Sequence, residues 1–125
     1  MKKLLTLTAL LESGTALGLL IVPSVVTTII LGSPVDIKVA LVISRISGIA
    51  LLVIGIICWV NRNEEQNKST KGLVGAIGLY NFGVIVVFVA AGLSPEPNGV
   101  GLWPIVVAHL IMGIWCVTIF LRNKH

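Results

Sequence analysis

Residues 39–60 read VALVISRISGIALLVIGIICWV, an apolar run that is interrupted by a single charge, Arg45. A helix needs about 20 mainly apolar residues to cross the hydrocarbon core of a bilayer. Three further runs of this kind lie at residues 4–31, 73–93 and 102–121. Lipid cannot hydrogen-bond an exposed backbone, so each run is expected to form a helix. The sequence therefore predicts an all-α integral membrane protein, a four-transmembrane-helix bundle in one domain over residues 1–125.

The composition agrees with this prediction. Of the 125 residues, 56% are hydrophobic and 11% charged, and the mean hydropathy is +1.04, which is far too apolar for the wetted surface of a soluble domain. The polar separators at residues 32–36, 61–71 and 94–99 are rich in turn-forming residues. Short separators predict two antiparallel hairpins, and Pro23 predicts a kink within the first helix.

The basic residues predict the orientation in the membrane. Seven of them flank one side of the predicted bundle: Lys2, Lys3, Arg62, Lys68, Lys71, Arg122 and Lys124. Only Lys38 flanks the other side, so the positive-inside rule predicts cytoplasmic termini in a multi-pass protein of the cytoplasmic (inner) membrane. The net charge of +4 is thereby explained by topology, and we expect the lipid bilayer as a partner and no nucleic acid.

Small residues recur at the spacing that lets helix backbones approach closely in lipid. The candidate packing positions are Gly14, Gly18, Ser44, Gly48, Gly72 and Ala76. Packing within the bundle is the simplest explanation. There are also more such positions than a single bundle obviously needs, which predicts self-association or a place in a larger membrane complex.

Each predicted helix also contains polar residues, which are costly inside a membrane and normally face a partner or a cavity. These are Glu12, Arg45, Tyr80 with Asn81, and His109. Counting about 1.5 Å per residue, Glu12 and Tyr80-Asn81 fall in one layer, whereas Arg45 and His109 fall in a second layer about 10 Å away. A long arginine could close most of that gap, which predicts an ion pair between Glu12 and Arg45. A functional site and a structural lock remain equal interpretations of this pair, and a purely structural role is favoured for Tyr80, Asn81 and His109.

The two halves of the chain are similar in pattern. Leu11-Glu12-Ser13-Gly14 parallels Tyr80-Asn81-Phe82-Gly83, and the segment from Arg45 to Gly48 parallels the segment from His109 to Gly113 with one inserted residue. The pattern raises the hypothesis of an internal duplication, in which a site would lie between the two hairpins. The abundance of glycine and isoleucine in this chain is the competing explanation.

Two functions remain open from the sequence. The favoured one is a non-catalytic, oligomer-forming or accessory subunit of a membrane complex. The alternative is binding or translocation of a proton, small ion or small amphipathic molecule at a polar core formed by Glu12, Arg45 and His109. No catalytic pair, paired carboxylates or metal-ligand spacing is present, so we expect no enzyme activity, cofactor or metal. Cys58 and Cys116 are interpreted as packing residues.

Overall fold

The computed structural model describes residues 1–122 and contains five helices: α1 (Lys2–Ile21), α2 (Pro23–Leu31), α3 (Lys38–Asn61), α4 (Lys68–Gly92) and α5 (Leu102–Arg122). No strand occurs in this part of the chain. Four helices, α1, α3, α4 and α5, are long and apolar enough to cross a membrane. The predicted all-α bundle of four transmembrane helices is therefore confirmed, and the protein is a multi-pass membrane protein.

The predicted continuous helix over residues 4–31 is wrong. The helix ends at Ile21, Val22 takes a non-helical conformation with φ −130° and ψ 57°, and Pro23 begins the short helix α2. Proline disfavours the helical conformation of the residue before it and is well suited to the first turn of a new helix. A 28-residue helix would also be about 42 Å long, well beyond the hydrocarbon thickness of about 30 Å. The chain therefore breaks at Pro23 where only a kink was predicted.

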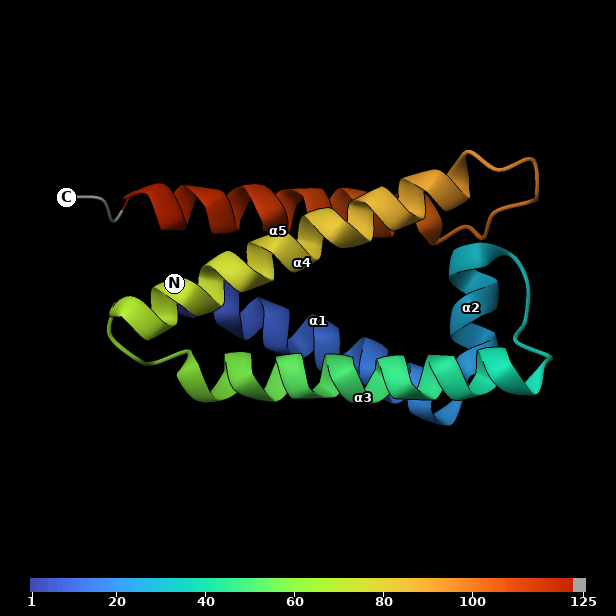
Figure 1. The fold of residues 1–125 in the computed structure, drawn as a ribbon, viewed down its shortest axis with the longest axis horizontal. Helices are drawn as coiled ribbons and strands as arrows, with labels where there is room; N and C mark the ends of the chain where they lie inside the picture. The colour runs from blue at the N-terminus through green and yellow to red at the C-terminus, as the bar shows by residue number, and fades with distance from the viewer. Residues whose placement is uncertain (123–125) are drawn as a thin grey trace.

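The four long helices form two antiparallel hairpins. α1 packs along α3 and α4 packs along α5, whereas α3 and α4 scarcely touch although they are consecutive. The start of α1 and the end of α5 lie at the same end of the bundle (Figure 1). We call this the basic end, because it carries Lys2, Lys3, Arg62, Lys68, Lys71 and Arg122. Lys124 lies outside the described residues.

The core of the protein lies toward the basic end. A cluster of buried side chains joins both hairpins there: Leu4, Leu5, Ala9, Cys58, Val74, Ile77, Met112 and Cys116. At the same end α4 begins at Lys68, five residues before the predicted start, because Asn67 caps it. The Asn67 side chain accepts hydrogen bonds from the Ser69 and Thr70 amides, and the Thr70 hydroxyl oxygen accepts one from the Asn67 amide. This capping box satisfies amides that the first turn would otherwise leave unpaired.

Helix α2 closes the opposite end, which we call the α2 end. It runs across the bundle from the α1–α3 hairpin toward the α4–α5 loop (Figure 1). There the amides of Gly99 and Gly101 donate to the carbonyls of Ile30 and Ile29, at 3.2 and 2.8 Å. A side chain at Gly99 has no room, since its Cβ would collide with the carbonyl oxygen of Ile29. The two hairpins are thus joined at both ends.

The predicted small-residue positions divide into inward and outward sets. A Cβ on Gly18 would meet Val26 of α2 at 2.8 Å, and one on Gly48 would meet the Ala16 carbonyl of α1 at 3.1 Å. These two glycines pack within the chain, and Ser44 lines a cavity between the hairpins. The outward set comprises Gly14, Gly72 and Ala76, which are all exposed.

Candidate intramembrane binding site

A cavity of about 670 Å³ lies between the two hairpins. All five helices contribute to its lining, and α2 borders it through Val26, Thr27, Ile30 and Leu31. Most of the lining is apolar, and the cavity is partly open to its surroundings. Pockets for drug-sized molecules usually measure about 300–1,000 Å³ and combine an apolar lining with a few placed polar groups. The size and composition of this cavity match that description.

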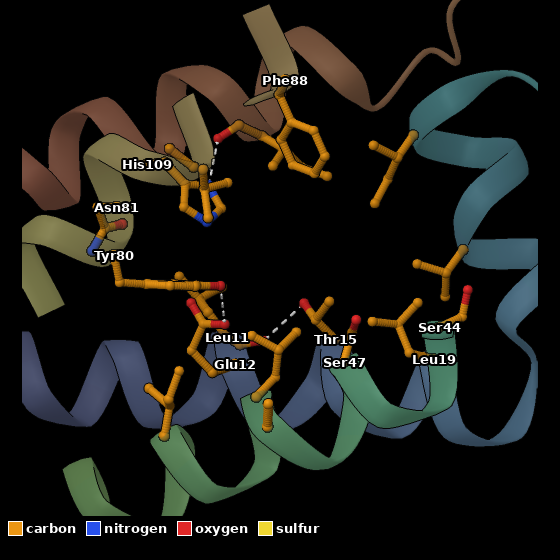
Figure 2. A pocket seen from close by; sticks show the side chains of 18 of the residues that line it. Leu11, Glu12, Thr15, Leu19, Ser44, Ser47, Tyr80, Asn81, Phe88 and His109 are labelled. Atoms are coloured by element: carbon orange, nitrogen blue, oxygen red, sulfur yellow. Dashed lines mark hydrogen bonds between the residues drawn. The ribbon is translucent and has the colours of Figure 1, made fainter. Parts of the chain in front are cut away.

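The polar part of the cavity is built around Glu12. Glu12 is buried, and the hydroxyl of Tyr80 donates a hydrogen bond to its Oε2 at 3.0 Å. The ring of His109 lies 6.0 Å from that of Tyr80, centroid to centroid. Figure 2 shows the three side chains converging from α1, α4 and α5. Each hairpin therefore contributes to one polar cluster, which we define as Glu12, Tyr80, Asn81 and His109.

The assignment of His109 to a separate layer is wrong. It lies with Glu12 and Tyr80, because α4 is inclined to its neighbours (Figure 1) and the long tyrosine side chain bridges the two hairpins. Counting residues from the helix ends places α-carbons along straight parallel axes. It takes no account of helix tilt or of the reach of side chains.

His109 and Asn81 each direct one side-chain nitrogen at a backbone carbonyl of their own helix. His109 Nδ1 lies 2.8 Å from the carbonyl oxygen of Ile105, and Asn81 Nδ2 donates to the carbonyl oxygen of Ile77 at 2.8 Å. A carbonyl can only accept, so the proton resides on His109 Nδ1. In the neutral ring, Nε2 is then an acceptor, and Asn81 Oδ1 is one as well.

Thr8 differs from three other hydroxyl residues that line the cavity. Thr15, Thr27 and Ser47 donate to carbonyls three or four residues earlier on their own helices, as hydroxyls in apolar surroundings commonly do. Thr8 is 1% exposed, and its Oγ1 has no hydrogen-bond partner. It lies four residues before Glu12 on the same face of α1. The polar side of the cavity therefore includes one buried hydroxyl that is unsatisfied.

The predicted Glu12–Arg45 ion pair is not formed. Among residues 1–122 the polar partner of the Glu12 carboxylate is Tyr80, and Arg45 is exposed and absent from the cavity lining. Arg45 lies on the exposed surface of α3, and the α3 residues that line the cavity, such as Ser47 and Ile54, are on another face of the helix. A lipid-facing arginine near a helix end can extend its guanidinium toward the membrane surface. Arg45 therefore does not belong to the polar cluster.

The described residues contain no group of three or more His, Cys, Asp or Glu side chains that could hold a metal ion. Cys58 and Cys116 are free thiols, both buried in the core at the basic end. The chemistry that the site offers is therefore hydrogen bonding and charge at the polar cluster, next to a large apolar surface.

Comparison of the chain with models of known protein families, with curated proteins and with solved structures finds no match. Two features of the site escaped the sequence analysis. One is Thr8, although its spacing of four residues from Glu12 was a readable signal. The other is the cavity itself, which no local pattern encodes.

Proposed function

We propose that the protein binds a small amphipathic molecule inside the bilayer, with the apolar body in the cavity and the polar group at Glu12. A single observation carries this proposal: the 670 Å³ apolar cavity ends at a buried carboxylate. Of the two functions that the sequence left open, this geometry favours binding. A structural lock would be a closed contact between polar side chains, without a void beside it.

The surroundings of the cavity support entry from the lipid. It lies among helices that could span a membrane, and the weak contact between α3 and α4 leaves the seam between the hairpins unsealed. The core cluster and α2 obstruct the two ends. A molecule that already partitions into the bilayer would reach the cavity sideways.

Filling the cavity tests this proposal. Ala108 lines it, and the change Ala108→Phe should occupy part of its volume. Ala90 is exposed on α4 and does not line the cavity, so Ala90→Phe is the matched control. Binding of three probes, dodecanol, dodecylamine and dodecanoic acid, would be titrated in nanodiscs and counted by native mass spectrometry. We expect at least one probe to bind at one copy per chain, and Ala108→Phe but not Ala90→Phe to abolish it. Absence of binding for all three would overturn the proposal.

We propose self-association as a second property, on a separate observation. A Cβ at Gly14 or Gly72 would meet no atom within 4 Å, so these positions are open on the helix surface, as is Ala76. Close backbone contact between chains could use them. Gly14→Leu or Gly72→Leu should shift the native mass toward monomer while helical content is retained. Gly48→Leu, which disturbs packing inside the chain, should instead unfold the monomer. A wild-type protein that is strictly monomeric and copurifies with nothing would exclude this property.

We also propose that the basic end faces the cytoplasm. Six described basic residues gather at this end, whereas Lys38 begins α3 at the α2 end. Single cysteines would replace Gln66 in the α3–α4 loop and Asn98 in the α4–α5 loop. A membrane-impermeant maleimide applied to intact cells should label the second and spare the first. The reverse pattern would show the opposite orientation.

A further inference from the structure

We propose that the polar group of the bound molecule is a hydrogen-bond-donating cation, namely a protonated amine on an apolar body, held by Glu12. This inference rests on the proposed function and specifies the chemical class of its ligand. It follows from three observations at the polar side of the cavity: its charge, its free acceptors and its unsatisfied hydroxyl.

The charge of the residues that line the cavity favours a cationic ligand. Glu12 is the one acidic residue among the lining residues, and none of them is lysine or arginine. Arg45, which the sequence predicted as the partner of Glu12, is exposed outside the cavity. A carboxylate in a membrane interior is costly unless a positive charge compensates it. His109 is the remaining ionisable base in the lining, and with its Nδ1 on the Ile105 carbonyl it has Nε2 left to face a ligand. A cationic ligand would supply the missing charge.

The free hydrogen-bonding groups favour the same ligand. Glu12 Oε1, neutral His109 Nε2 and Asn81 Oδ1 are all acceptors without a partner in the described chain. The corresponding donors are already used: the Tyr80 hydroxyl on Glu12, His109 Nδ1 on Ile105 and one Asn81 N–H on Ile77. A primary ammonium group has three donors and no acceptor. It therefore complements a cluster in which acceptors are in excess.

Thr8 provides the independent observation. Its buried Oγ1 has no partner and lies one helical turn from Glu12. Leaving a buried hydroxyl unpaired costs stability, and the usual bond to a carbonyl of its own helix is not made. The oxygen has almost no accessible surface, so an ammonium group at Glu12 would reach it after a rotation of the Thr8 side chain, which lines the cavity. The hydroxyl then gains its bond in the occupied protein.

The rest of the cavity suits the apolar body of such a molecule. Beyond the polar cluster the lining continues with Val84, Phe88 and Ile105, and then with the residues of α2. Phe88 faces the cavity on the side of His109, as Figure 2 shows. Burial of alkyl or aryl surface here would add affinity without adding specificity for the polar group.

The test compares three probes of equal chain length: dodecylamine, dodecanol and dodecanoic acid. In wild-type protein we expect the amine to bind most tightly and the acid most weakly. Glu12→Gln removes the charge at nearly constant shape, and should weaken amine binding about 10- to 100-fold, the range for a lost hydrogen bond to a charged group. Dodecanol binding should change little. Glu64→Gln, in the exposed α3–α4 loop, makes the same change of net charge and should have no effect.

A second variant guards against misfolding of Glu12→Gln. Thr8→Val should leave the empty protein as stable as wild type or more stable, because it removes an unsatisfied hydroxyl, and should still weaken amine binding. Thr118→Val is its control, since Thr118 is exposed on α5 and bonds to the Trp115 carbonyl.

The outcomes separate this inference from the proposed function. If no probe binds, or Ala108→Phe leaves binding intact, the proposed function itself fails. If the alcohol or acid binds as tightly as the amine, or Glu12→Gln leaves amine affinity unchanged, the cavity binds amphipathic molecules but the cationic assignment is wrong. Equal binding of alcohol and amine would indicate that His109 already compensates the carboxylate.

Discussion

The α1–α3 and α4–α5 hairpins share a design but pack differently. In the first, the glycines of α3 lie against the backbone of α1: a Cβ on Gly48 would lie 3.1 Å from the Ala16 carbonyl oxygen, and one on Gly55 3.2 Å from the Ala9 carbonyl oxygen. In the second, a Cβ on Gly113 would meet the ring of Phe82 at 3.0 Å, and one on Gly78 would meet Cys116 at 3.2 Å. The glycines of the first hairpin therefore face backbone as well as side chains, including Leu20 and Ser13, whereas those of the second face side chains alone.

The hairpins also differ in the orientation of the polar residue on their second helix, Arg45 on α3 and His109 on α5. Glu12 and Asn81, which the duplication hypothesis pairs, are both buried at the cavity. Arg45 and His109, its other pair, face opposite ways: Arg45 is exposed and His109 lines the cavity. A shared packing pattern thus leaves the placement of polar groups free to differ. The duplication stays a hypothesis.

The largest expected effect concerns the two packing modes. Alanine at Gly48 presses on a carbonyl that cannot move away, whereas alanine at Gly113 presses on a phenylalanine ring that can rotate. We expect Gly48→Ala to destabilise by about 1–3 kcal/mol, the usual cost of overpacking, and Gly113→Ala to cost clearly less. Both changes gain the same helix propensity, so that contribution cancels. Reversible unfolding in mixed micelles would measure the difference, and equal losses would show that the hairpins pack alike.

A smaller effect is expected where the hairpins meet. The Tyr80 hydroxyl donates to Glu12 across the seam, so Glu12→Gln and Tyr80→Phe should be energetically coupled. Such contacts within membranes average about 0.6 kcal/mol and reach about 1.7 kcal/mol. A double-mutant cycle on unfolding in mixed micelles would give the coupling. Strict additivity would mean that this hydrogen bond does not hold the hairpins together.

The smallest effect concerns Arg45. Because Arg45 is exposed and Glu12 bonds to Tyr80, Glu12→Gln and Arg45→Met should add within about 0.3–0.5 kcal/mol, as independent sites do. A double-mutant cycle with Glu12→Gln and Arg45→Met, on unfolding in mixed micelles, would measure their coupling energy. A coupling larger than that of Glu12 with Tyr80 would restore the ion pair that the sequence predicts.

Much of the fold could be predicted because the bilayer constrains it. Length and apolarity identify the spans in α3, α4 and α5 to within a few residues, apart from the five added at the start of α4 by the Asn67 cap. The separate helix α2 was missed because its residues are as apolar as a membrane span. Pro23 marked the position but did not indicate whether the chain would kink or break.

The candidate site was predicted only as a set of residues. The sequence singled out Glu12, Tyr80, Asn81 and His109 because polar groups in apolar runs are conspicuous. It did not pair Glu12 with Tyr80, since their contact joins residues 68 positions apart. The structural role favoured for Tyr80 and His109 overlooked a cavity that both side chains line.

The sequence by itself determined that four apolar spans form two hairpins, that basic residues gather at one end, and that each span carries polar groups. Only the tertiary structure decided which way each span is turned. The physical reason lies in the solvent: α3 is apolar nearly all round, and lipid accepts apolar side chains on any face, so no periodic pattern marks its buried side. The rotation of α3, set by the contact of Gly48 and Gly55 with α1, turned Arg45 outward. It left the Glu12 carboxylate to Tyr80 and the cavity.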